Sequence, residues 1–186
     1  MEYICHLLYK FRLNNLRIFL IIPVIYFISE EKNYLNWIAL VLFVVAGLTD
    51  HLDGFIARKT GTTSSLGALL DLVADKLLIS IVLIYILSTS DNEYLLMPSL
   101  VIVSRELIVT SLRQFLAEAY GKNPIKVSFI AKSKTTMQII SLSFLIISPN
   151  LNDNAYLLTV GLFWITSFVS VYSLYEYLRA YQKLIK

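Results

Sequence analysis

The fold is decided by residues 48–78, LTDHLDGFIARKTGTTSSLGALLDLVADKLL, which place four aspartates inside apolar sequence. The four are Asp50, Asp53, Asp71 and Asp75. Between the two pairs, residues 59–65 are rich in Gly, Thr and Ser, which is typical of a turn. The apolar sequence on both sides predicts two helices joined by that turn. We call residues 48–78 the aspartate hairpin.

Apolar runs continue on both sides of the aspartate hairpin. Of the 186 residues, 57% are hydrophobic, which is more than soluble proteins usually contain. The runs cover residues 16–29, 35–48, 77–88, 94–103, 127–148 and 155–177. A helix needs about 20 residues to cross the hydrocarbon core of a bilayer, and with their polar ends these runs reach that length. The sequence therefore predicts a single all-α membrane domain over residues 1–186 with six transmembrane helices.

Charge placement predicts how these helices are oriented. With six helices, every one of the 16 Lys and Arg residues except Lys32 falls on one side of the membrane. Basic residues concentrate on the cytoplasmic side, so both termini and the turn of the aspartate hairpin are predicted to be cytoplasmic. The basic residues are spread over helix ends rather than grouped on one module, which argues against nucleic-acid binding. Membrane lipids are the expected surroundings.

The geometry of a helical hairpin predicts that the aspartates face one another. Residues equally far from the turn lie at the same depth, so Asp50 should face Asp75 and Asp53 should face Asp71. Four ionised carboxylates away from water repel one another. Hard divalent cations with oxygen ligands, a pair of Mg²⁺ or Mn²⁺ ions, would compensate this charge. The alternative is that the aspartates form buried salt bridges with basic residues, for which Arg58 and Lys76 could supply part of the charge.

The fixed residues of the hairpin resemble a family signature. The pattern Asp50-x₂-Asp53-Gly54-x₂-Ala57-Arg58-x₈-Gly67-x₃-Asp71-x₃-Asp75 is similar to that of the CDP-alcohol phosphatidyltransferases. Further along, Ser104-Arg105-Glu106-Leu107-Ile108 and Ala131-Lys132-Ser133-Lys134-Thr135-Thr136 resemble the bacterial phosphatidylglycerophosphate synthase branch of that family. The resemblance implies a six-helix enzyme of the inner (cytoplasmic) membrane. Such an enzyme moves a substituted phosphoryl group from a CDP-linked donor to an alcohol and releases CMP.

The resemblance also implies roles for the hairpin residues. Asp50, Asp53 and Asp71, with Asp75 beside them, would hold the metal ions that bind the pyrophosphate of the donor. Asp75 would be the general base. The nucleotide-binding residues would be Asp50, Gly54, Ala57, Arg58 and Gly67, the small ones leaving room for the cytidine nucleotide and Arg58 lying near its phosphates.

The branch implies that phosphatidyl transfer runs from CDP-diacylglycerol to glycerol 3-phosphate, at a site facing the cytoplasm. An acceptor with its own phosphate needs cationic ligands, either bidentate Arg or point-charge Lys. Helix periodicity places Arg105 and Arg113 on neighbouring stripes of one helix, and Lys132 and Lys134 open the next. We therefore expect Arg105, Arg113, Lys132 and Lys134 to bind the acceptor phosphate. The alternative is that some of these side chains only extend to lipid headgroups.

Other functions remain open from the sequence. Inositol phosphate would suit the same cations, whereas serine carries no phosphate. Outside the family, a divalent-cation transporter could use the four carboxylates as a midplane site. Residues 35–45 and 77–87 are nearly all apolar, however, and leave no polar path onward. The resemblance further implies a homodimer, and tyrosines near helix ends, including Tyr26, Tyr156 and Tyr177, predict an interfacial aromatic belt.

Overall fold

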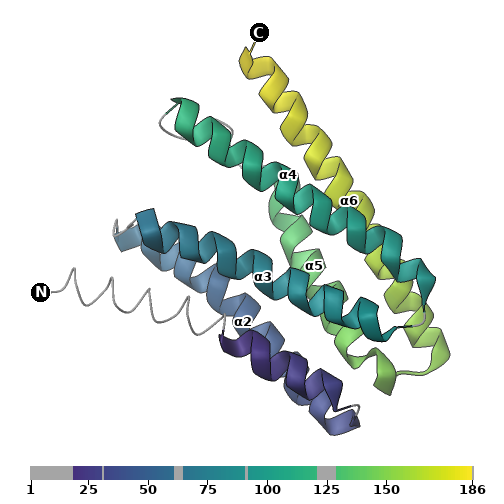
Figure 1. Ribbon diagram of the computed structural model, residues 1–186. Coiled ribbons are helices and arrows are strands. Elements are labelled where there is room, and N and C mark those ends of the chain that lie inside the picture. Colours follow the sequence, from purple (N-terminus) through teal and green to yellow (C-terminus); the bar gives the residue numbers. More distant parts are fainter. Residues whose placement is uncertain (1–18, 31, 61–64, 91, 121–128, 186) are drawn as a thin grey trace, which may run out of the picture. The chain divides into compact units, whose positions relative to one another are not determined.

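The computed structural model describes residues 19–30, 32–60, 65–90, 92–120 and 129–185, and all their regular structure is helical (Figure 1). Side chains are described for these residues except 49–60, 65–72, 75, 129, 131, 132, 184 and 185. The helices are Phe19–Ser29, α2 (Asn33–Thr60), α3 (Ser65–Thr89), α4 (Leu96–Tyr120), α5 (Phe129–Ile147) and α6 (Asp153–Ile185), with 3₁₀ turns η1 (Glu93–Leu95) and η2 (Ser148–Asn150). The predicted all-α class is confirmed.

Local chemistry explains where several of these helices begin and end. The Asn152 side-chain oxygen accepts a hydrogen bond from the Ala155 N–H at 2.9 Å, just before α6 begins. Such a cap satisfies a first-turn N–H that has no partner within the helix. At the other end of the same connection, Pro149 follows α5 within η2. The residue before a proline disfavours helical backbone, so α5 ends at Ile147.

The chain divides into two compact units, and the first holds the aspartate hairpin. It comprises the described residues up to Thr89 together with Ser143–Leu151. Within it, α2 contacts both α3 and η2. Asn36 is buried and its amide donates to the Asn150 side-chain oxygen at 3.3 Å, while the Asn150 amide donates to the Asn33 carbonyl at 2.9 Å. These bonds fasten the start of α2 to η2 within this unit.

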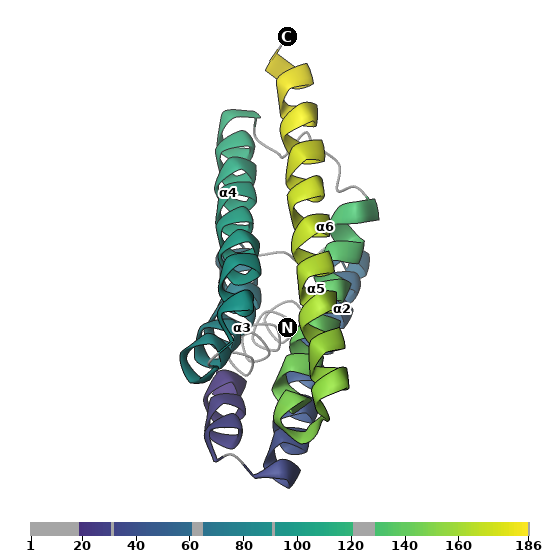
Figure 2. The same cartoon turned by 90° about the vertical axis from the view of Figure 1, so that its right-hand side faces the viewer.

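The second unit comprises Ser90–Leu142 and Asn152–Lys186. In it α4 packs against α6, the two helices lying side by side (Figure 1 and Figure 2). Val109, Leu116 and Tyr177 form a buried apolar contact between them. The α6 side of the unit also buries the small polar residues Thr166, Ser167, Ser170 and Ser173. Small side chains let helices approach closely, so the last apolar run packs inside this unit as expected. The prediction of a single domain stays a prediction.

Two helices of the described part are long and apolar enough to cross a membrane. They are Glu93–Tyr120, of 28 residues and mean hydropathy 1.7, and Asp153–Lys183, of 31 residues and mean hydropathy 1.8. Phe19–Ser29, Asn33–Leu48 and Lys76–Thr89 are shorter apolar helices. The predicted membrane character has this support, whereas six crossings and cytoplasmic termini stay predictions.

The predicted aromatic belt needs one correction. Tyr26, Tyr34, Trp37 and Tyr94 are exposed, as an interfacial position requires. Tyr177, in contrast, is only 8% exposed and packs in the apolar contact between α4 and α6. The assignment of Tyr177 to the belt was therefore wrong, because its position near a helix end says nothing about which way its ring points.

Candidate active site

The four aspartates lie on two helices that contact each other. Asp50 and Asp53 are in the C-terminal half of α2, and Asp71 and Asp75 are in the N-terminal half of α3. Asp50 precedes the end of α2 at Thr60 by as many residues as Asp75 follows the start of α3 at Ser65. These boundaries support the predicted equal depth. The four side chains, and those of Gly54, Ala57, Arg58 and Gly67, lie outside the described part, so their facing arrangement stays a prediction.

The helix faces that carry the aspartates point inward where side chains are described. On α2, Ala46 and Gly47 lie one turn before Asp50, and both are buried. On α3, Ala74 is fully buried beside Asp75, and Leu78, three residues after it, is 4% exposed. Val73 and Leu48 are exposed, so the burial follows one face rather than a whole segment. Residues three and four apart share a helix face, so the buried described residues lie on one face of each helix, next to the positions of the aspartates. The direction of the aspartate side chains stays a prediction.

This donor set fits a hard divalent cation. Mg²⁺ and Mn²⁺ prefer carboxylate oxygens, and carboxylates on inner helix faces need compensating positive charge. Among the side chains that the structure describes, no three His, Cys, Asp or Glu residues lie close enough together to hold a metal. The four aspartates lie outside that search, and the hairpin stays the metal site predicted from the sequence.

A second polar centre is built where α4, α5 and α6 meet. Arg105 on α4 is 5% exposed and Lys134 on α5 is 2% exposed. Both donate to the same carboxylate oxygen of Glu106, Arg105 through Nη1 at 3.2 Å and Lys134 through Nζ. We call Arg105, Glu106, Arg113 and Lys134 the basic cluster. The structure thus brings Arg105 and Lys134 together as predicted, while the side chain of Lys132 lies outside the described part.

Helix α6 supplies partners for the two arginines of the basic cluster. Arg105 Nη2 donates to the hydroxyl oxygen of Ser173 at 2.8 Å. The guanidinium carbon of Arg113 lies 5.6 Å from the centroid of the Tyr177 ring, within range of a cation–π contact. The Nε atoms of Arg105 and Arg113 are buried and have no hydrogen-bond partner among the described residues. Each arginine therefore keeps a buried donor that none of the described residues accepts from.

Ser173 and Glu106 had no predicted role in the site, and Tyr177 was predicted to lie in the interfacial belt instead. A signal for Ser173 existed, because Ser167, Ser170 and Ser173 recur every third residue in the uncharged middle part of α6. A polar stripe on such a helix indicates an inner face. Four further buried groups also lack partners among the described residues: the Gln138 side-chain nitrogen, the Ser170 and Tyr177 hydroxyls and one Glu176 carboxylate oxygen. The polar lining of this unit therefore extends beyond its charged members.

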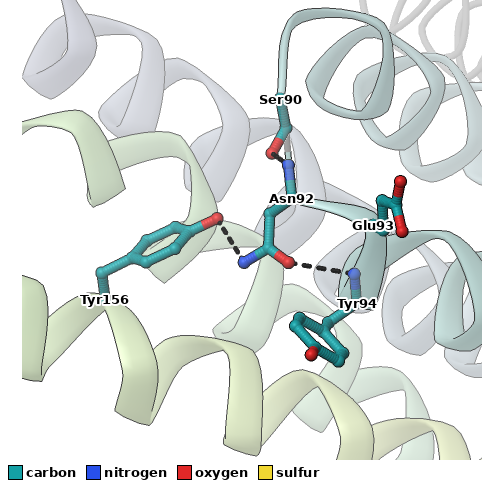
Figure 3. A pocket seen from close by; sticks show the side chains of 5 residues that line it. All are labelled: Ser90, Asn92, Glu93, Tyr94 and Tyr156. Atoms are coloured by element: carbon teal, nitrogen blue, oxygen red, sulfur yellow. Dashed lines mark hydrogen bonds between the residues drawn. The ribbon is translucent and has the colours of Figure 1, made fainter.

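A cavity of about 590 Å³ in the second unit is lined by Ser90, Asn92, Glu93, Tyr94 and Tyr156 (Figure 3). Its polar groups largely satisfy one another. The Asn92 amide donates to the Tyr156 hydroxyl at 3.0 Å, its side-chain oxygen accepts from the Tyr94 N–H at 2.9 Å, and its own N–H donates to the Ser90 hydroxyl at 3.2 Å (Figure 3). These bonds cap η1 and fasten it to α6. The cavity contains none of the predicted site residues.

Comparison with known proteins identifies the family. The family model described as CDP-alcohol phosphatidyltransferase matches residues 13–172. Over 145 residues, 77% of this chain and 78% of the relative, the chain is 41% identical to the CDP-diacylglycerol–glycerol-3-phosphate 3-phosphatidyltransferase of Rickettsia bellii (strain RML369-C). It is 38% identical to the protein of the same name from Rickettsia felis (strain ATCC VR-1525 / URRWXCal2) over 88% of this chain and 90% of the relative. It is 33% identical to that from Escherichia coli (strain K12) over 76% of this chain and 77% of the relative.

The match covers both centres described above. Residues 13–172 include all four aspartates and the whole basic cluster, and end one residue before Ser173. The resemblance carried by the spacing of the aspartates is therefore confirmed at the level of the whole chain. This protein belongs to the CDP-alcohol phosphatidyltransferase family, a family of membrane phosphotransferases.

Proposed function

We propose that this chain transfers the phosphatidyl group of CDP-diacylglycerol to glycerol 3-phosphate, giving phosphatidylglycerophosphate and CMP in phospholipid biosynthesis. The observation that carries the proposal is its 38% identity, over 88% of its length, to a relative named for that reaction. Membership in a transferase family favours this activity over divalent-cation transport.

In this proposal the aspartate hairpin binds the donor. Asp50, Asp53, Asp71 and Asp75 hold a pair of Mg²⁺ or Mn²⁺ ions, which when bound neutralise the pyrophosphate and the charge that develops on the leaving CMP. Gly54, Ala57 and Gly67 leave room for the cytidine nucleotide, which Asp50 and Arg58 contact. The small inner-face residues Ala46 and Ala74, both fully buried, support a close approach of the two helices at this level.

Asp75 acts as the general base. The acceptor hydroxyl oxygen attacks the phosphorus that carries diacylglycerol, the bond from that phosphorus to CMP breaks, and the hydroxyl proton passes to Asp75. A positioned carboxylate contributes to such a step by taking the proton as the new bond forms. The neighbouring Ala74 is fully buried, which supports a protected environment at this level of α3.

The basic cluster, together with Lys132, binds the phosphate of glycerol 3-phosphate. Arg105, Arg113 and Lys134 carry the charge and the N–H donors that a phosphate requires. A buried charged N–H without a partner costs about 1–3 kcal/mol or more, and a phosphate oxygen is a partner that would remove this cost. The unpartnered Nε atoms of both arginines support this assignment.

The proposal also includes the membrane topology and the oligomeric state of the enzyme. The six helices cross the inner (cytoplasmic) membrane, with both termini and the site on the cytoplasmic side and lipid around the outer faces. The two long apolar helices and the exclusion of basic residues other than Lys32 from one side support this topology. The enzyme acts as a homodimer, as the family resemblance implies.

The test is an acceptor comparison with purified protein in detergent micelles containing CDP-diacylglycerol and Mg²⁺. CMP release is measured with glycerol 3-phosphate, inositol phosphate or serine, and with no acceptor as the control. We expect glycerol 3-phosphate alone to support rapid CMP release with formation of phosphatidylglycerophosphate. Equal or faster release with inositol phosphate would contradict the assigned acceptor, and release with none of them would contradict the reaction.

A further inference from the structure

Glu106 links two cations that come from different helices. One oxygen of its carboxylate accepts hydrogen bonds from Arg105 Nη1 on α4 and from Lys134 Nζ on α5. Its side chain is 15% exposed, so this contact is largely removed from water. Lys and Arg side chains have many rotamers, and fixing each of them has an entropic cost. A carboxylate shared by both side chains holds them in one arrangement before any ligand arrives.

Ser173 fixes the orientation of the Arg105 guanidinium. Nη1 is bound to Glu106 and Nη2 donates to the Ser173 hydroxyl at 2.8 Å. Because the guanidinium group is a rigid plane, two bound nitrogens determine where its third nitrogen points. That third nitrogen, Nε, is buried without a hydrogen-bond partner among the described residues. The fold thus holds an unused cationic donor in a set direction.

We propose that Glu106 and Ser173 are positioning residues for the acceptor phosphate, an inference that rests on the proposed function. They act through Arg105 and Lys134, holding the Arg105 Nε–H and the Lys134 ammonium ready for a phosphate oxygen. Glu106 is itself negative and therefore opposes the incoming phosphate. Its contribution is preorganisation, because side chains already fixed in the binding geometry lose less entropy when the ligand binds.

The test compares Glu106→Gln, Ser173→Ala and Ser173→Thr with the native enzyme. KM for glycerol 3-phosphate, KM for CDP-diacylglycerol, kcat and the thermal midpoint are measured for each. We expect Glu106→Gln to raise the glycerol 3-phosphate KM at least about ten-fold and Ser173→Ala at least about five-fold, as loss of hydrogen bonds to charged groups does. The CDP-diacylglycerol KM stays unchanged, and Ser173→Thr, which keeps the hydroxyl, recovers most of the affinity.

Ser99→Ala is the matched control. Ser99 is a buried serine of α4 whose hydroxyl donates to the Leu95 carbonyl in the preceding turn, at 2.6 Å, and not to a cation. Its loss should leave both KM values unchanged. If Glu106→Gln does not yield folded protein, the comparison of Ser173→Ala with Ser173→Thr tests the positioning role.

Two outcomes separate the two proposals. Native enzyme that releases no CMP with glycerol 3-phosphate overturns the proposed function and this inference with it. Native enzyme that is active, with Glu106→Gln and Ser173→Ala changing only the thermal midpoint or kcat, overturns the positioning role alone. An equal rise in KM for glycerol 3-phosphate and for CDP-diacylglycerol in these variants also overturns the positioning role.

Discussion

The aspartate hairpin and the basic cluster carry charges of opposite sign and differ in how those charges are balanced. The hairpin puts four carboxylates on two adjoining helices within residues 48–78. Like charges there need compensating cations, which divalent metal ions would supply under the proposed function. The basic cluster instead contains its own counter-anion, Glu106, and is built from residues far apart in sequence, 28 residues for Glu106–Lys134 and 68 for Arg105–Ser173. The four aspartates are therefore close together in the sequence. The residues of the basic cluster come together only when α4, α5 and α6 pack.

Removal of divalent cations should have the largest effect. If the hairpin needs ions to balance its charge, EDTA should abolish CMP release, and added Mg²⁺ or Mn²⁺ should restore it. The measurement is the initial rate of CMP release in dialysed protein across a titration of each ion. Ca²⁺ at the same concentration controls for ionic strength. Full activity in EDTA would contradict the proposed need for divalent cations, because the aspartates would then be neutralised within the protein.

Asp75→Asn should lower kcat by about 10² to 10⁴-fold, the range of a general base. The amide keeps the shape of the side chain but cannot take a proton. Mn²⁺ binding, followed by titration calorimetry, should persist through the other three aspartates. Asp153→Asn, in the first turn of α6 on the predicted outer side, is the control and should retain native kcat. Near-normal turnover of Asp75→Asn with metal bound would remove Asp75 from the proton transfer.

Arg105→Ala should raise KM for glycerol 3-phosphate about ten- to a hundred-fold, since hydrogen bonds to charged groups contribute about 1.5–3 kcal/mol. KM for CDP-diacylglycerol should not change, because the hairpin binds the donor. Arg179→Ala, an exposed arginine of α6, is the control for loss of a basic charge. Equal effects on the two substrates would show that the basic cluster does not discriminate acceptor from donor.

Tyr177→Leu should have the smallest effect, a rise of about two- to five-fold in KM for glycerol 3-phosphate. The substitution keeps the apolar contact with Val109 and Leu116 and removes the ring against which Arg113 lies. A partly buried cation–π contact contributes about 0.5–1 kcal/mol, which corresponds to that change. Tyr156→Leu, which removes the hydroxyl bound by Asn92, is the control and should alter thermal stability only.

Much of the hairpin could be predicted from the chain itself. Two helices were predicted on either side of residues 59–65, and the structure has α2 ending at Thr60 and α3 beginning at Ser65, with residues 61–64 outside the described part. The helix around each aspartate pair and the burial of Ala74 on the Asp75 face follow from apolar periodicity and small-residue placement. Burial of Arg105 agrees with its predicted functional role, because a cation inside an apolar helix needs a partner.

The details of the basic cluster were not predictable in the same way. The sequence placed Arg105 and Arg113 near each other by helix phase, and Lys134 near them because it opens the next helix on the same side of the membrane. It did not indicate that Arg105 and Lys134 share one oxygen of Glu106. It placed Tyr177 at the membrane interface, whereas the ring lies under Arg113. From the sequence, Ser173 could not be distinguished from the other small residues of its helix.

The sequence by itself determined the helices, the turn between the aspartate pairs and the family. Each of these depends on residues within a few turns of one another, since helical hydrogen bonds and the spacing of a signature are local. Only the tertiary structure decided which side chains of α4, α5 and α6 meet, because such contacts depend on how packed helices are rotated and which rotamers their neighbours allow. The orientation of the Arg105 side chain, which is bound to both Glu106 and Ser173, is one of the features that only the tertiary structure decided.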